Sequence, residues 1–190
     1  MKVKDIISVL EEFAPLSVQE SWDNSGLCVG SPEDEVTSVL LGLDCTPALV
    51  DEAVACGADM IVTHHPLIFK GVKKISPEDQ TGEAIIKAIR AGISVYAAHT
   101  SADKVLAGVS GAMAERLGLK NVRILDEDGE GTGLGTVGEF EVPMTSEEAL
   151  ALVKERFGLK VVKASKPLEG KIERVAMSCR LSFHFLDCVL

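Results

Sequence analysis

Paired cysteines, basic residues and long apolar runs are all scarce in this sequence of 190 residues. The five cysteines are odd in number and form no Cys-x-x-Cys motif, which argues against a disulfide framework and against a ribbon-type zinc site. Only 19 basic residues stand against 29 acidic ones, so the formal net charge is -10. This charge argues against binding to a nucleic-acid backbone, which needs clustered lysine and arginine. No apolar run is long enough to span a bilayer, so no membrane association is expected.

The N-terminal stretch MKVKDIISVLEEFAPL also lacks the continuous apolar core of a signal peptide, because Asp5, Glu11 and Glu12 interrupt it. With its scattered cysteines, the chain is predicted to be cytoplasmic and reduced. Hydrophobic residues, in contrast, make up 46% of the sequence, which is enough to form a packed core.

Strands and helices alternate over the first part of the chain. Apolar periodicity predicts helices at Val3–Phe13, between Thr46 and Gly57, after Ser76 and at about Lys104–Leu117, and buried strands at Val36–Leu43, Ala58–His65 and Ile93–Ala98. Thr46 and Ser76, each followed by proline, have the pattern of helix N-terminal caps, and Ser76 to Asp79 matches a capping box. This alternation predicts an α/β fold in which a parallel sheet carries helices on both faces.

The composition changes at about Asp126, where the acidic, glycine-rich stretch DEDGEGTGLGTVGEF begins. We therefore predict an N-terminal α/β metal-binding domain over residues 1–125 and an incomplete second α/β domain, with an atypical tail, over residues 126–190. The segment EVPMTSEEALALVKERFGLKVVKA indicates strand, helix and strand, with Thr145 or Ser146 as N-cap. Lys171–Met177 is predicted to form one more strand.

Polar side chains gather where the predicted parallel strands end. Asp44, His64, His65, His99 and Asp103 all lie at or just after such an end. Ligands of open parallel sheets bind beyond the carboxyl ends of the strands, so these residues are expected to share one crevice.

The adjacent histidines admit two interpretations. One ring could face the core while the other faces solvent, since neighbours on a strand point to opposite sides. Alternatively, Pro66 ends the strand, and both His64 and His65 project into the crevice, each towards its own cation. With His99 and Asp103 following the next strand, we favour a mixed histidine and carboxylate metal site. Such ligands suit zinc, manganese, iron or nickel, and the sequence does not choose among them.

Several other motifs carry less weight. GLGTVG, from Gly133 to Gly138, matches a dinucleotide-binding fingerprint, but a strand follows it, so we interpret it as a glycine-rich turn. Cys179, His184 and Cys188 fit no established zinc spacing. No nucleophile elbow of a serine hydrolase is present. One cluster of cations follows the histidine pair, either as an ordinary solvated loop or as a phosphate-binding element: Lys70, Lys73 and Lys74.

Four motifs occur in the order typical of one family: SWDNSGLCVG, VTHHPLIFKGVKKI, VYAAHTSADKVLAGVS and GLGTVGEF. Over residues 1 to about 177 the chain resembles the Nif-three-like family, whose members are often called GTP cyclohydrolase 1 type 2 or dinuclear metal-binding proteins. The resemblance implies a two-domain α/β subunit that assembles into a ring-shaped homohexamer, with two divalent metal ions in each subunit.

The resemblance also implies roles for individual residues. His64, His65 and Asp103 match the family's metal ligands, and His99 is a neighbouring candidate for proton transfer. The family supplies a further histidine and a glutamate near its C-terminus, whereas here the match stops after ERVAMSC. We therefore expect a frameshifted or prematurely ended form of a longer protein, with incomplete metal sites.

Two functions follow as hypotheses. The first is a metal-dependent hydrolase of a nucleotide-like substrate, in which Lys70, Lys73 or Lys74 holds phosphate. The second is a metal carrier or regulatory assembly protein without turnover. Loss of the C-terminal ligands would also allow an inactive remnant.

Overall fold

The structure, a computed structural model, describes residues 1–179. The chain forms two compact units, Met1–Ala102 and the part from Asp103 onward. The change of composition at Asp126 lies inside a β-hairpin of the second unit. No helix within the described residues is both long and apolar enough to cross a membrane.

The first unit is built on a four-stranded sheet with the order β1-β4-β3-β2. Its strands are β1 (Gly26–Val29), β2 (Val39–Asp44), β3 (Met60–His65) and β4 (Ser94–Ala97). Strands β2, β3 and β4 are parallel, as predicted, whereas β1 adds an antiparallel edge that was not predicted. Its helical elements are α1 (Val3–Phe13), the short 3-10 helix η1 (Leu16–Val18), α2 (Pro47–Cys56) and α3 (Gln80–Ala91).

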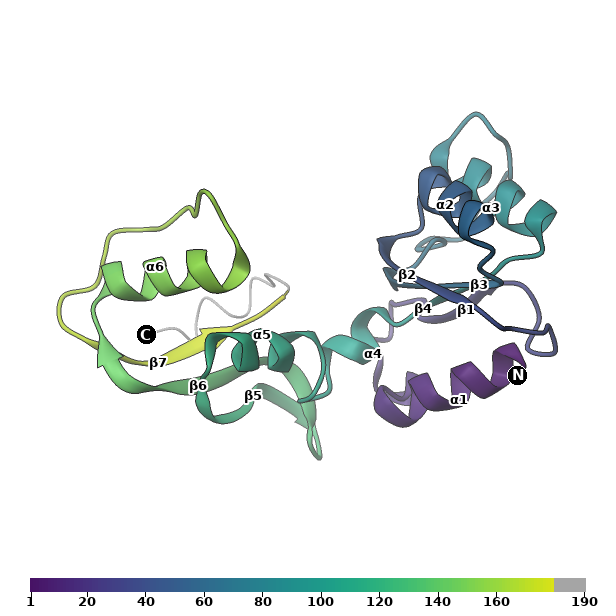
Figure 1. The fold of residues 1–190 in the computed structure, drawn as a ribbon. Coiled ribbons are helices and arrows are strands. Elements are labelled where there is room, and N and C mark those ends of the chain that lie inside the picture. The colour runs from purple at the N-terminus through teal and green to yellow at the C-terminus, as the bar shows by residue number, and fades with distance from the viewer. Residues whose placement is uncertain (180–190) are drawn as a thin grey trace. The chain divides into compact units, whose positions relative to one another are not determined.

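Helices cover both faces of this sheet, which confirms the predicted α/β class (Figure 1). Helix α1 lies on one face, where Val3 packs with Met60, Val62 and Tyr96. Helices α2 and α3 lie on the other face over a second apolar cluster that includes Ile61. Because β3 is buried on both faces, its apolar residues are continuous instead of alternating.

Capping residues explain where the helices of this unit begin and end. The Thr46 side chain accepts a hydrogen bond from the Leu49 backbone N–H, and Gly57 ends α2 in the left-handed conformation, as predicted. The predicted capping box at Ser76 was wrong. Helix α3 begins later, because the Asp79 carboxylate accepts from the Gly82 backbone N–H at 2.8 Å and thereby caps it.

The long helix predicted from about Lys104 was also wrong. The chain instead forms the short helix α4 (His99–Asp103) and, after a turn, the helix α5 (Val109–Leu117). Val105 makes an isolated β-bridge with Thr132. This bridge takes the backbone out of helical conformation between α4 and α5. Gly108 is the N-cap of α5, and Gly118 ends it as predicted.

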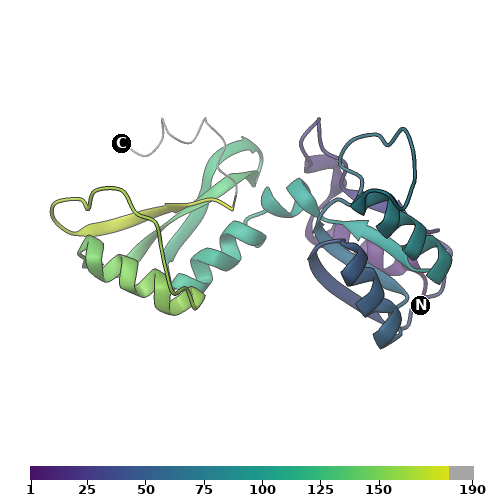
Figure 2. The same cartoon turned by 90° about the horizontal axis from the view of Figure 1, so that it is seen from above.

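The second unit contains a three-stranded antiparallel sheet of β5 (Lys120–Gly129), β6 (Thr132–Met144) and β7 (Ile172–Met177). Helices α5 and α6 (Ser146–Phe157) pack on it around Ala114, Leu117, Phe140 and Met177. Thr145 caps α6 within a capping box, as expected. Figure 2 shows the same elements from above.

Two expectations for this unit were wrong. The GLGTVG motif is not a turn but part of strand β6, because its glycines allow close backbone approach. A Cβ atom on Gly133 would lie 2.1 Å from the carbonyl oxygen of Asp126 on the paired strand. The strand expected after α6, over residues 159–164, does not form, and β7 pairs directly with β6.

Candidate metal site

The candidate site lies at the carboxyl ends of the parallel strands. His64 and His65 are the last two residues of β3, and His99 begins α4, separated from the end of β4 only by Ala98. The parallel register places Asp44, at the end of β2, opposite His65. The ends of the parallel strands therefore bring these side chains together at one edge of the sheet, where the strand pattern predicted a crevice.

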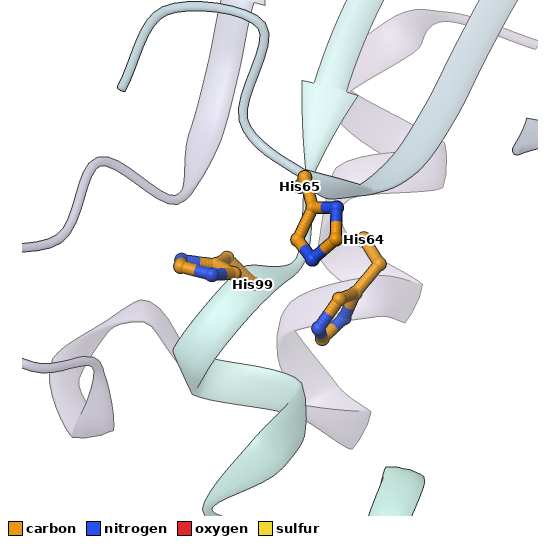
Figure 3. Close-up of side chains that lie close together, drawn as sticks. All are labelled: His64, His65 and His99. Atoms are coloured by element: carbon orange, nitrogen blue, oxygen red, sulfur yellow. The ribbon is translucent and has the colours of Figure 1, made fainter. Parts of the chain in front are cut away.

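Three imidazoles gather at this edge (Figure 3). One ring nitrogen from each of His64, His65 and His99 lies within 4.8 Å of the others. The ring centroids are 5.0 Å apart for His64 and His65, 5.4 Å for His64 and His99, and 5.7 Å for His65 and His99. We call these three residues the histidine cluster. Its nitrogens are close enough to share one ion.

Two of the rings are held by carboxylates. The Nδ1 atom of His99 lies 2.7 Å from Oδ1 of Asp23, whose side chain is fully buried. The Nδ1 atom of His65 lies 2.7 Å from Oδ1 of Asp44, in a pair that is about half exposed. An ionised carboxylate can only accept, so each Nδ1 carries the hydrogen, and Nε2 is the nitrogen left to face a metal ion. This carboxylate–histidine arrangement is typical of metal ligands in proteins.

Asp23 is the residue that organises the loop around His99. Its Oδ2 atom accepts from the Thr100 backbone N–H at 3.0 Å, from the Thr100 hydroxyl, and from the Ser25 hydroxyl at 2.8 Å. Burial by itself raises the pKa of Asp23, but the hydrogen bonds from Thr100, His99 and Ser25 outweigh it and hold that pKa well below its usual range. Asp23 is therefore an anion throughout the physiological range.

Sequence reasoning did not assign Asp23 to the site. The signal available was its position beside the only tryptophan of the chain, within the turn-forming stretch SWDNSG. Asp44 was expected in the crevice, but its contact with His65 was not. Asp23 and Asp44 are both far from their histidine partners in the sequence, and no known motif spacing connects them.

The other residues predicted for the site are not members of the histidine cluster within the described residues. Asp103 is buried, belongs to the second unit as the last residue of α4, and accepts from the Cys179 thiol at 3.1 Å. It is not a member of the histidine cluster among the described residues, and its role as a ligand stays a prediction. The three loop lysines, Lys70, Lys73 and Lys74, are exposed between β3 and α3. His184 and Cys188 lie outside the described residues.

A polar cavity of about 370 Å³ adjoins the cluster at His65. Asp44, Thr46 and Pro66 contribute to its wall, with the first residues of α3, Gln80 and Thr81. The loop lysines do not line it. The cavity gives a small polar molecule room to lie beside the His65 ring.

The donor set fits a divalent transition metal. Imidazole nitrogen suits zinc, iron and nickel alike, and three protein ligands leave a coordination position open for water or substrate. The geometry thus supports a site that could hold a metal ion, in agreement with the crevice expected from the sequence.

A family description, Duf34/NIF3 (NGG1p interacting factor 3), matches residues 1–179. This protein belongs to the Duf34/NIF3 family. The resemblance seen in the sequence motifs is therefore confirmed. A relative from Clostridium acetobutylicum, named "GTP cyclohydrolase 1 type 2 homolog", is 38% identical over 180 residues, covering 93% of this chain and 67% of its own length. A Clostridium perfringens protein of the same name is also 38% identical and is covered over 68% of its length.

Solved structures agree with the Duf34/NIF3 assignment. The Staphylococcus aureus protein SA1388 superposes with a TM-score of 0.91 at 30% identity, over 97% of this chain and 74% of its own. A Bacillus cereus protein related to NIF3 has a TM-score of 0.85 at 24% identity, over 93% and 75% of the two chains, and supports the fold. This chain spans about two thirds of the length of its clostridial relatives.

The Asp44–His65 pair gives a first prediction. Asp44→Asn is expected to weaken zinc binding by about 10-fold, because it removes the charge that orients His65 but leaves a neutral acceptor. Stability should change little, because both side chains are about half exposed. Calorimetric titration with zinc measures the affinity. Asp51→Asn is the matched control, since Asp51 is an exposed carboxylate paired with Lys87 on helix α3. An equal loss in both variants would contradict the role of Asp44.

Proposed function

We propose that this Duf34/NIF3 protein is a metal-dependent hydrolase that acts on a nucleotide-like substrate. The observation that carries the proposal is the histidine cluster, with one nitrogen of each ring within 4.8 Å of the others at the carboxyl ends of β3 and β4. The name of the clostridial relatives, GTP cyclohydrolase 1 type 2 homolog, supports a nucleotide as the class of substrate.

The chain's own residues have separate tasks in this proposal. His64, His65 and His99 hold the ion, while Asp23 and Asp44 fix the rings of His99 and His65. A bound divalent ion would supply Lewis acidity and lower the pKa of a water molecule. The cavity beside His65 admits the substrate, and the exposed loop lysines are proposed to contact its phosphates as mobile point charges.

The decisive experiment measures metal content and turnover on the same preparation. Protein loaded separately with zinc, manganese, iron or nickel is incubated with GTP and with nucleotide phosphoesters, and released formate and phosphate are quantified. We expect turnover that is absent after chelation and in His99→Gln. Tight metal binding without turnover on any substrate would contradict the hydrolase and favour a metal carrier.

A further inference from the structure

We propose that Trp22 and Phe69 form the surface that binds a planar heteroaromatic ring of the ligand and place that ring beside His99. The inference deepens the proposed function, on which it rests for the ligand's being a substrate. It assigns recognition of the ring to two side chains that are not metal ligands.

The three rings form a contiguous group. The Trp22 and Phe69 ring centroids are 6.0 Å apart, and they lie 6.2 Å and 6.0 Å, respectively, from that of His99. All three contacts are steeply inclined, with interplanar angles of 63°, 77° and 89°. In such a contact the edge of one ring meets the face of another, which holds the three rings at fixed inclinations.

Both aromatic side chains retain a large exposed surface. Trp22 is 45% exposed and Phe69 is 44% exposed, whereas Tyr96 and Phe140 are buried in the cores of their units. The chain has only one tryptophan, one tyrosine and six phenylalanines. Two of these few rings therefore stay accessible while touching a residue of the histidine cluster, which is the arrangement of a binding surface.

Hydrogen bonds fix the two loops that carry the rings. The Asn24 side-chain amide donates to the carbonyl oxygen of Ile68 at 2.6 Å, joining a residue near Trp22 to the neighbour of Phe69. Asp23, between Trp22 and Asn24, is bound to His99 and Thr100. The ring pair is thus positioned from both sides, so little conformational entropy is lost when a ligand binds.

The chemistry of the pair selects the class of ligand. Aromatic side chains bind the π-face of a nucleobase without needing a particular hydrogen-bond pattern. A sugar phosphate without a base offers no such face. A purine or a similar fused heterocycle is therefore the ligand that we commit to, and burial of the pair by a second copy of the chain is an outcome that the test detects.

The single tryptophan makes the inference directly measurable. Trp22 is the only tryptophan, so the tryptophan fluorescence of the protein reports on this site alone. The protein, with and without zinc, is titrated with GMP and with ribose 5-phosphate, which lacks the base. We expect GMP to change the fluorescence saturably and ribose 5-phosphate to leave it unchanged. Equal responses to the two ligands, or none to either, would overturn the inference.

Affinities of the variants complete the test. Trp22→Leu and Phe69→Leu should each raise the Kd for GMP, measured by calorimetry, by about 5- to 100-fold. Phe157→Leu is the matched control, because Phe157 lies in the second unit and its ring contacts Arg116. Unchanged affinity in both site variants would overturn the inference. It would also be overturned if the fluorescence changed with protein concentration but not with ligand, because the rings would then lie in an interface between copies of the chain.

This experiment separates the inference from the proposed function. GMP binding that depends on Trp22 and Phe69, in protein that turns nothing over, would support the inference while contradicting the hydrolase. Turnover that persists undiminished in Trp22→Leu and Phe69→Leu would support the hydrolase while contradicting the inference.

Discussion

A variant that combines His64→Ala with His65→Ala is expected to lose metal binding almost completely. Loss of a group that merely supports a ligand weakens binding by about 10- to 100-fold, so loss of two direct ligands should cost at least about 1,000-fold. Only His99 would remain of the histidine cluster. Elemental analysis of purified protein, with zinc titration of the stripped protein, measures the effect.

The chain offers a control of the same residue type. His184→Ala removes the only histidine outside the cluster, and we expect it to bind zinc like the unaltered protein. Circular dichroism tests whether the double variant is folded, and we expect it to be, because His64 and His65 are partly exposed at the end of β3. Metal retained by the double variant would place the binding site elsewhere in the chain.

Asp23→Asn is expected to have the second-largest effect, on both metal affinity and stability. The amide cannot accept as strongly from His99, Thr100 and Ser25, and its NH₂ group must donate within a site built from donors. We expect zinc affinity to fall by about 10- to 100-fold and the free energy of unfolding to fall by about 2 to 4 kcal/mol. Zinc titration and urea denaturation measure the two quantities.

Asp59→Asn provides the matched control for this variant. Asp59 also accepts several hydrogen bonds, from Thr37 and Ser38, but it is only partly buried and lies just before β3, at the end opposite to the histidines. Its replacement should leave zinc affinity unchanged. A similar loss of affinity in both variants would show that the Asp23 effect is general destabilisation.

The pH dependence of the Asp23 contribution has a definite sign. Because the folded-state pKa of Asp23 is lowered, the folded protein releases this proton more readily than the unfolded chain does. The contribution to stability is therefore fully present above the ordinary aspartate pKa of about 3.9 and is lost as the pH falls below it. Urea denaturation over that acidic range should show a steeper loss in the unaltered protein than in Asp23→Asn.

Local signals in the sequence predicted much of what positions the site. The apolar run ending at His65, followed by Pro66, predicted the strand and its carboxyl end, and Thr46 and Gly57 predicted both ends of α2. These features succeed because strand burial and helix caps depend on residues close together in the chain.

The features that failed depend on distant contacts. Asp23 reaches His99 across 76 residues, and no spacing in the sequence marks that pair. The helix expected from Lys104 is interrupted by the bridge between Val105 and Thr132, which is likewise remote in sequence. The glycines around Gly133 looked like a turn, but they lie in a strand where the partner backbone comes too close for a side chain.

The order of the chain has a consequence for biosynthesis. The histidine cluster, its two supporting carboxylates and the aromatic pair all lie within Met1–Ala102, the first compact unit. Domains generally fold as units during translation, with the N-terminal one first. The cluster can therefore assemble on the nascent polypeptide while the ribosome is still adding the second unit. Binding of the proposed metal ion would then be a cotranslational event, set by the metals available in the compartment where the protein is made.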